Sequence, residues 1–118
     1  MSVTAPDLAH GVPRSGRDLL GGWAWLARLA DKVRAAQAGT AGEYVAYCPL
    51  SMGFLRAAGI SRSDFDQLVS EGAGDAELAH WFDRHSSPER KDAANAFVLE
   101  EHAESLDAQD QEEGRTGR

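Results

Sequence analysis

The sequence predicts an all-α protein of four to five helices around a long central helix near the N-terminus. Two observations lead to this fold class. Residues 19–38 are apolar around most of a helical circumference, and Arg28 is the only charge between positions 19 and 30, which is typical of a helix buried on most sides. The rest of the chain is a series of short apolar runs with helix start and stop signals, and it contains only one strand-like run.

The predicted central helix covers residues 19–38, with Asp18 as its N-cap and Gly39 ending it. Gly21 and Gly22 stand in its first turn, where each glycine costs about 1 kcal/mol relative to alanine. Two interpretations follow. Either another segment approaches the backbone closely at this point, or the helix begins only at Trp23.

Shorter elements follow the central helix. Residues 1–16 are predicted to form an extended arm, and residues 43–50 (EYVAYCPL) an extended segment across the helices, because a lone strand is not stable. From residue 107 the composition is polar and acidic, which predicts a disordered tail over 107–118 and a single domain over 1–106. Further helices are predicted at 52–58, 62–71, 76–85 and 88 to about 106.

Charge and composition exclude several classes of protein. The net charge is −7, and no basic stripe is present to neutralise phosphates, which argues against a nucleic-acid partner. No apolar run reaches the roughly 18 residues that span a bilayer, and the N-terminus lacks a signal-peptide pattern, so we expect no membrane partner and a cytoplasmic location. The single cysteine, Cys48, excludes an internal disulfide and a multi-cysteine zinc site, and no motif calls for a cofactor.

Several short motifs follow one another in a fixed order over roughly residues 7–100. They are Pro13-Arg14-Ser15, Gly21-Gly22, Leu26-Ala27-Arg28, Asp31-Lys32, Gly42-Glu43-Tyr44 and Cys48-Pro49-Leu50, followed by Leu55, Gly59-Ile60, Phe65 and Trp81. This ordered set resembles a family of small bacterial proteins known only as a domain of unknown function. The resemblance implies a shared fold and draws attention to Arg28, Asp31 and Lys32, but it implies no activity.

One polar cluster is the leading candidate for a binding site. Residues three and four apart on a helix are neighbours, so Arg28 is expected to reach Asp31 and Lys32, and Arg14 to join them from the preceding loop. Arginines bind carboxylates and phosphates through two parallel hydrogen bonds, which makes the cluster, with Tyr44 beside it, a candidate site for an anion. The competing interpretation is that the same charges lock the N-terminal arm onto the helix.

Two other groups of residues carry weaker signals. Cys48 would need a base within hydrogen-bond reach to act as a nucleophile, and His10 and His80 are the candidates. A free cysteine is more often a small buried hydrophobe. His80, Asp83 and His85 lie close in sequence, but the two histidines are not spaced three or four apart as a helical metal site requires, so no metal is predicted.

These residues favour a small binding or adaptor module that holds an anionic small molecule or a partner's acidic group. One alternative is an enzyme in which Asp31 is the general acid or base and Lys32 or Arg28 stabilises charge. Another is a homo-oligomer whose interface contains the last helix and Trp25, because Trp25 projects away from the apolar face of the central helix. Whether the protein is an enzyme is left open by the sequence.

Overall fold

The structure, a computed structural model, describes residues 3–115. These residues contain no β-strand, so the all-α fold class is confirmed, with six helices in place of four to five. The helices are α1 (Leu26–Ala38), α2 (Pro49–Ala58), α3 (Arg62–Ser70), α4 (Asp75–His85), α5 (Pro88–Ala96) and α6 (Ala103–Glu112), with a π-helical turn, η1 (Phe97–Glu101), between the last two.

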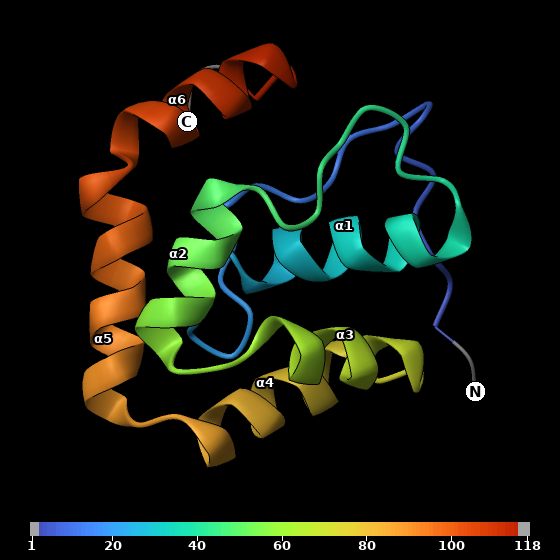
Figure 1. Cartoon of the computed structure of the whole chain (residues 1–118). Coiled ribbons are helices and arrows are strands. Elements are labelled where there is room, and N and C mark those ends of the chain that lie inside the picture. Colours follow the sequence, from blue (N-terminus) through green and yellow to red (C-terminus); the bar gives the residue numbers. More distant parts are fainter. Residues whose placement is uncertain (1–2, 116–118) are drawn as a thin grey trace.

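Helix α1 lies in the middle of the molecule (Figure 1). It packs against α3 and α4 on one side, while α2 packs against α5 and η1. Helix α5 stands upright along one edge of the view, and α6 turns away from it across the top. The N-terminal arm, residues 3–16, carries no helix or strand and runs past α1. One side of α1 therefore faces the core, and another faces the arm and α6.

The prediction of a long central helix is wrong. Helix α1 begins at Leu26 and has 13 residues, and the longest continuous helical run is α5 with η1, at 14 residues. Residues 19–25 form a tight loop instead, in which Leu19 is 61% exposed. Asp18 does not cap a helix, because its carboxylate accepts a hydrogen bond from the Ser15 N–H (3.1 Å).

Close approach by another segment explains the glycine pair in this loop. Gly21 and Gly22 have positive φ angles of 59° and 83°, and a Cβ at Gly21 would lie 2.5 Å from that of Ala79 in α4. Asn95 of α5 fixes the loop by accepting a hydrogen bond from the Ala24 N–H and donating one to the Gly22 carbonyl, both 2.9 Å. These tertiary contacts override the helical periodicity of the sequence.

The other helix signals place their elements to within a few residues. Gly39 and Gly59 end α1 and α2 in the left-handed conformation, with φ of 77° and 73°. Ser61 and Ser87 cap α3 and α5 by accepting hydrogen bonds from the backbone N–H three residues ahead. Residues 40–48 form no strand, but α2 begins at Pro49, inside the predicted extended segment and three residues before the predicted helix.

The prediction of a disordered tail from residue 107 is wrong for the residues that the structure describes. Helix α6 runs to Glu112, and Leu106 is 1% exposed. Asp110 is 4% exposed, and the Glu113 side chain 7%. Residues 116–118 of the predicted tail lie outside the described residues. The acidic end of the chain is therefore part of the packed structure.

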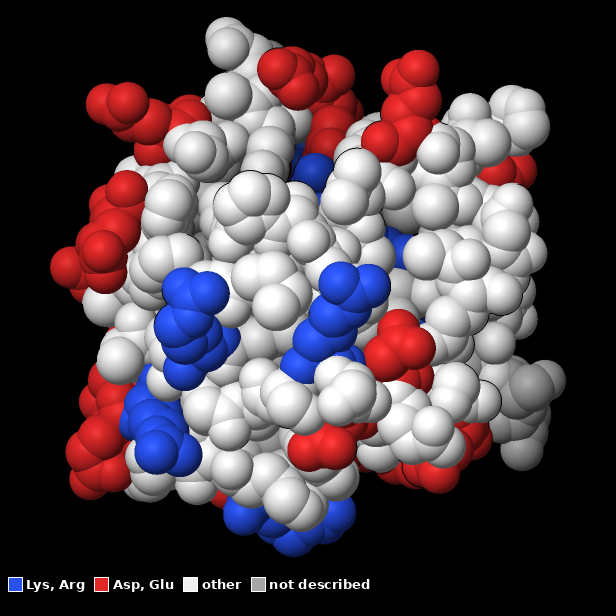
Figure 2. All heavy atoms as spheres, in the orientation of Figure 1, with Lys and Arg blue, Asp and Glu red and all other residues white. Residues whose placement is uncertain are grey.

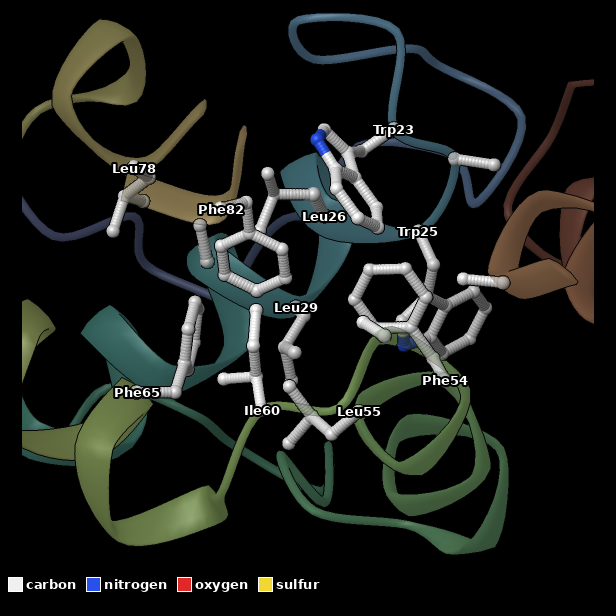
Figure 3. Packing of buried hydrophobic residues seen from close by; sticks show 14 of the residues in the cluster. Trp23, Trp25, Leu26, Leu29, Phe54, Leu55, Ile60, Phe65, Leu78 and Phe82 are labelled. Carbon is white, nitrogen blue, oxygen red and sulfur yellow. The ribbon is translucent and has the colours of Figure 1, made fainter. Parts of the chain in front are cut away.

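The apolar core lies between α1 and helices α2 to α4, and it is rich in aromatic rings (Figure 3). Phe82 meets Trp23 and Phe65 edge to face, with ring centroids 5.2 and 5.7 Å apart, a geometry that the aromatic quadrupole favours. The Trp23 indole N–H donates to Asp83 (2.9 Å). Trp23, from the loop over residues 19–25, thus joins that loop to the helices after it in one core.

Charges of both signs are spread over the surface. On the face shown in Figure 2, acidic side chains gather along the upper edge, and basic side chains stand in separate groups below them. Within residues 3–115, no helix combines the length and the apolar character that crossing a bilayer would require.

Candidate functional site

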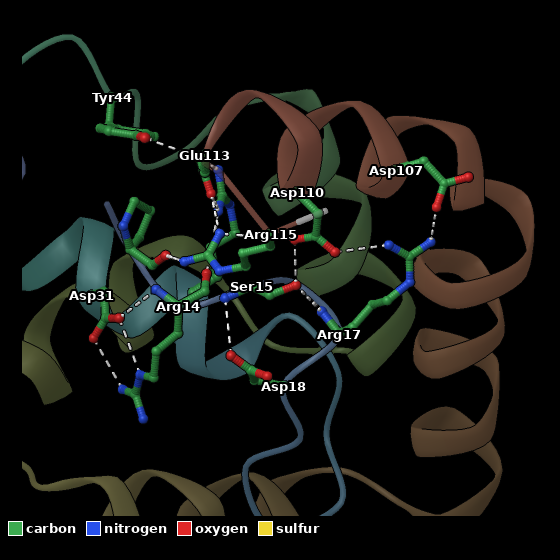
Figure 4. Close-up of polar contacts among 12 residues, drawn as sticks. Arg14, Ser15, Arg17, Asp18, Asp31, Tyr44, Asp107, Asp110, Glu113 and Arg115 are labelled. Atoms are coloured by element: carbon green, nitrogen blue, oxygen red, sulfur yellow. Dashed lines mark hydrogen bonds and ion pairs between the residues drawn. The ribbon is translucent and has the colours of Figure 1, made fainter. Parts of the chain in front are cut away.

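The five predicted site residues all lie on or beside α1. Arg28, Asp31 and Lys32 come from the helix, Arg14 from the N-terminal arm, and Tyr44 from the segment after α1. They do not form a single cluster. The structure divides them among three polar groups, each completed by residues distant in sequence. Figure 4 shows the contact of Arg14 with Asp31 in the first group and the surroundings of Glu113 in the second.

The first group anchors the N-terminal arm. The Asp31 carboxylate accepts hydrogen bonds from the Arg14 backbone N–H (2.9 Å), from its Nε (3.0 Å) and from its Nη2 (3.0 Å). The opposite edge of Arg14 donates to Asp75 of α4 (2.8 and 3.2 Å), which also accepts from Arg34 (2.9 Å). These arginines hold the pKa of Asp75 below its usual value. Asp31 is thus paired with Arg14 and not, as expected, with Arg28.

The second group is a carboxylate cradle, formed by Arg28, Tyr44 and Arg115 around Glu113. Arg28 is 3% exposed, and its two terminal nitrogens donate to the two oxygens of Glu113, each at 2.8 Å. The Tyr44 hydroxyl donates to Oε2 (2.9 Å), and Arg115 contacts Oε1. Burial alone would raise the pKa of Glu113, but these hydrogen bonds outweigh it and hold the pKa at about 2.

The cradle leaves one donor of Arg28 unused. The Nε of Arg28 is buried and has no hydrogen-bond partner among the described residues. The guanidinium lies 5.6 Å from the ring centre of Trp25 and 5.7 Å from that of Tyr44, an arrangement in which ring faces attract a cation. Arg28 is therefore held by aromatic rings and the Glu113 carboxylate, with its hydrogen-bonding capacity incompletely used.

The third group joins Lys32 to Cys48, the residue before α2. Lys32 is 4% exposed, and its Nζ lies 3.6 Å from the Cys48 Sγ. Burial lowers the pKa of Lys32. Burial alone would raise the pKa of the Cys48 thiol, but hydrogen bonds from Ser51 and the charge of Lys32 bring it below its ordinary value. The partner of Cys48 is thus a lysine and not the predicted His10 or His80.

A further set of contacts, which the sequence did not predict, ties α6 to Ser15 of the arm and to Arg17. Asp110 accepts from the Ser15 hydroxyl (2.7 Å) and from Arg17 (2.9 Å), and Arg17 also donates to Asp107 (2.6 Å). The spacing of residues after position 105 is the sequence feature that could have predicted a packed helix here. Leu106, Asp110 and Glu113 are four and three apart, which places them on one face of a helix.

Two of the alternative functional hypotheses lose their structural basis. Trp25 is fully buried, and its indole N–H donates to Ser51 (3.0 Å), so it is not a surface anchor for a partner. Both oxygens of Asp31 accept hydrogen bonds from Arg14, which gives no support to an acid–base role. Within residues 3–115, no three His, Cys, Asp or Glu side chains converge as metal ligands would.

Comparison with known proteins places the chain in a family. A search of curated proteins finds no match. A family model described as "Domain of unknown function (DUF5069)" matches residues 10–117, a range that includes all six helices, the arm from His10 onward and the carboxylate cradle. The expected resemblance is confirmed, and the chain belongs to the DUF5069 family of domains of unknown function.

Proposed function

We propose that this protein binds an anionic group and that the carboxylate cradle is where the anion binds. One observation carries the proposal. A carboxylate already lies in the cradle, held by a two-pronged contact from Arg28 and a hydrogen bond from Tyr44. Donors arranged in this way recognise carboxylates and phosphates. The chain's own Glu113 serves as a stand-in for the external ligand.

The position of Glu113 supports its exchange for an external anion. Glu113 follows the last residue of α6, and Gly114 after it has a φ of 82°. Helix ends open locally at a lower free energy than core segments do. When Glu113 leaves, Arg28 becomes a buried charge without its partner, an arrangement that costs several kcal/mol. An external carboxylate that takes the same place offsets this cost.

Two further features support anion binding: the unused donor of Arg28 and the protonation state of the Tyr44 hydroxyl. A buried N–H without a partner costs about 1–3 kcal/mol, and the Nε of Arg28 is such a group, so a ligand that also satisfies Nε has an advantage over Glu113. Burial and the contact with Glu113 raise the pKa of Tyr44. Its hydroxyl is therefore protonated at neutral pH and donates to an anion.

The test removes the Glu113 carboxylate from the cradle. In the Glu113→Ala variant, sodium succinate or inorganic phosphate is expected to bind saturably, to raise the Tm and to shift the indole N–H resonance of Trp25 in ¹⁵N spectra, because the Trp25 ring lies against Arg28. Glu112→Ala is the matched control. It removes the same charge from the neighbouring exposed position and is expected to leave binding as weak as in the wild type.

A double variant tests whether Arg28 is the group that binds the anion. Arg28→Gln combined with Glu113→Ala removes both charges of the buried pair, so the interior is left without an uncompensated ion. We expect this variant to fold and to lose the binding gained by Glu113→Ala. If Glu113→Ala binds neither probe more tightly than Glu112→Ala, the contact between Arg28 and Glu113 is a structural ion pair and the proposed function is wrong.

A further inference from the structure

Lys32, which is buried, and Cys48, which is partly buried, form a pair that the carboxylate cradle does not use. The Nζ of Lys32 has one hydrogen-bond partner among residues 3–115, the Cys48 Sγ at 3.6 Å. No carboxylate in that range lies within ion-pair distance of this ammonium, although Glu113 acts on it from further away. Burial favours the neutral amine of a lysine, and a compensating charge beside it favours the ammonium. The sulfur is the group placed to carry that charge.

The direction of a neighbouring hydrogen bond supports an anionic sulfur. The Trp25 indole N–H can only donate, so Ser51 Oγ is the acceptor in their 3.0 Å contact. This leaves the Ser51 hydroxyl hydrogen free to point at the Cys48 Sγ, 3.4 Å away. The sulfur thereby accepts from both Ser51 and Lys32, and hydrogen bonds of this kind stabilise a thiolate more than a thiol.

The backbone adds donors on the same side. Cys48 is the N-cap of α2, which has 10 residues, and the backbone N–H groups of Leu50 and Ser51 interact with its sulfur. Thiolates are stabilised at the N-termini of helices and beside lysines. Cys48 is also only partly buried. Helix α1 supplies the cation, and α2 supplies the sulfur and the dipole.

We propose that Cys48 is a reactive thiolate and a modification site for hydrogen peroxide, with Lys32 as its positioning cation and proton donor. The sulfur attacks one oxygen of the peroxide, so an S–O bond forms as the O–O bond breaks. The departing hydroxide takes a proton from the Lys32 ammonium and leaves as water. The products are a Cys48 sulfenic acid, a neutral Lys32 amine and one water molecule.

The sulfenic acid has no second cysteine to react with inside the chain, because Cys48 is the only one. An external low-molecular-weight thiol resolves it instead, with formation of a mixed disulfide and release of water. The charged groups that face the pair are Lys32 and Arg28 from α1 and Glu113 after α6. Of these, Lys32 contacts the sulfur directly and has the largest expected effect on its reactivity.

The first measurement is the rate of iodoacetamide alkylation of the wild-type protein as a function of pH. We expect the rate to rise with a midpoint well below the ordinary thiol value of about 8.5. The Cys48→Ser variant must show no labelling. Because this experiment needs no variant of Lys32, it decides the proposal even if such a variant fails to fold. A midpoint at or above the ordinary value overturns it.

Variants then assign the effect to Lys32. Lys32→Met keeps the length of the side chain and removes its charge, and we expect alkylation and peroxide oxidation at pH 7 to slow by about tenfold or more. Lys91→Met is the matched control. The Nζ of Lys32 lies 5.2 Å from the ring centre of Trp25, and that of Lys91 lies 5.3 Å from the ring centre of Trp23, but Lys91 makes no contact with Cys48 among residues 3–115. Equal rates in Lys32→Met and the wild type contradict the proposal.

The Ser51→Ala variant tests whether the Ser51 hydroxyl acts on the Cys48 sulfur or only supports the fold. Loss of its hydroxyl is expected to raise the midpoint pH of alkylation, a result that a purely structural role of Ser51 would not produce. Peroxide treatment followed by dimedone and intact-mass analysis identifies the product. One dimedone adduct per chain supports the sulfenic acid, and an unmodified chain at peroxide concentrations that oxidise free cysteine overturns it.

Discussion

At the scale of single residues, Trp25 shows why apolar spacing predicted a helix over residues 19–25, where the structure has a loop. It is the one non-glycine residue among positions 3–115 with a positive φ, 71°, a conformation that costs about 1–2 kcal/mol in an L-residue. The fold compensates by burying the whole ring and by hydrogen bonds from its indole N–H to Ser51 and its backbone N–H to Gly16. Apolar periodicity indicates only that Trp25 is large and apolar, and it contains no information about the backbone conformation.

The predicted site shows the same limit. The neighbourhood of Arg14, Arg28, Asp31 and Lys32 around α1 was predictable, because residues three and four apart share a helix face. Their partners were not, because the contacts of Arg28 with Glu113 and of Lys32 with Cys48 join residues far apart in the chain. A local rule cannot pair charges that only the tertiary fold brings together.

Asp31 is expected to act as an architectural anchor. The Asp31→Asn change keeps the shape of the side chain but turns one acceptor of Arg14 hydrogen bonds into a donor, at a position whose side chain is 13% exposed. We expect the free energy of unfolding to fall by about 1–2 kcal/mol, or several degrees in Tm. Asp92→Asn, at an exposed position in α5, is expected to change the Tm little. An unchanged Tm in Asp31→Asn would return this carboxylate to the list of functional candidates.

At the scale of elements, capping residues were better guides than composition. Gly39, Gly59, Ser61 and Ser87 marked helix ends correctly because a cap acts through its immediate neighbours. The acidic composition after residue 106 predicted disorder, yet α6 forms. Asp110 of α6 pairs with Arg17, next to the N-terminal arm, and Glu113, which follows α6, pairs with Arg28 of α1. The composition of a segment gives its own charges, but it does not show which charges another segment brings next to it in the fold.

Two acids on α6 that share one partner test how that helix is held. Arg17 binds both Asp110, whose side chain is 6% exposed, and Asp107, whose side chain is 72% exposed. We expect Asp110→Asn to destabilise the protein by about 2 kcal/mol, because buried donors lose a charged acceptor. The same change at Asp107 should cost less than about 1 kcal/mol. Urea unfolding of both variants measures the difference, and equal losses would show that α6 docks through its apolar contacts alone.

At the scale of the whole molecule, the carboxylate of Glu113 should contribute most to the loss of stability in acid. The folded pKa of Glu113 is about 2, below the value of about 4.3 in an unfolded chain. Its ionisation therefore contributes stability that is fully present above the unfolded pKa. That contribution is lost as the pH falls toward 2, and its full size is on the order of 3 kcal/mol.

The measurement is urea unfolding of the wild type and of Glu113→Gln between pH 7 and pH 3. We expect the difference in unfolding free energy to be constant above about pH 5 and to shrink below it, because the wild-type carboxylate loses its charge advantage as it is protonated. Glu112→Gln, next to it and exposed, should show a small difference at every pH. A gap that persists unchanged at pH 3 would mean that Glu113 stabilises by packing and not by charge.

The contacts between the arm and α6 also bear on how the protein is made. Ribosomes synthesise chains from the N-terminus, and a domain generally folds as a unit. Arg28 is therefore present well before its internal carboxylate, and Pro13 and Ser15 before Arg115 and Asp110. During that interval the nascent chain exposes an arginine that has no acidic partner from α6. If the cradle binds an external anion as proposed, Arg28 is open to that anion with least competition while the chain is being synthesised, before Glu113 reaches it.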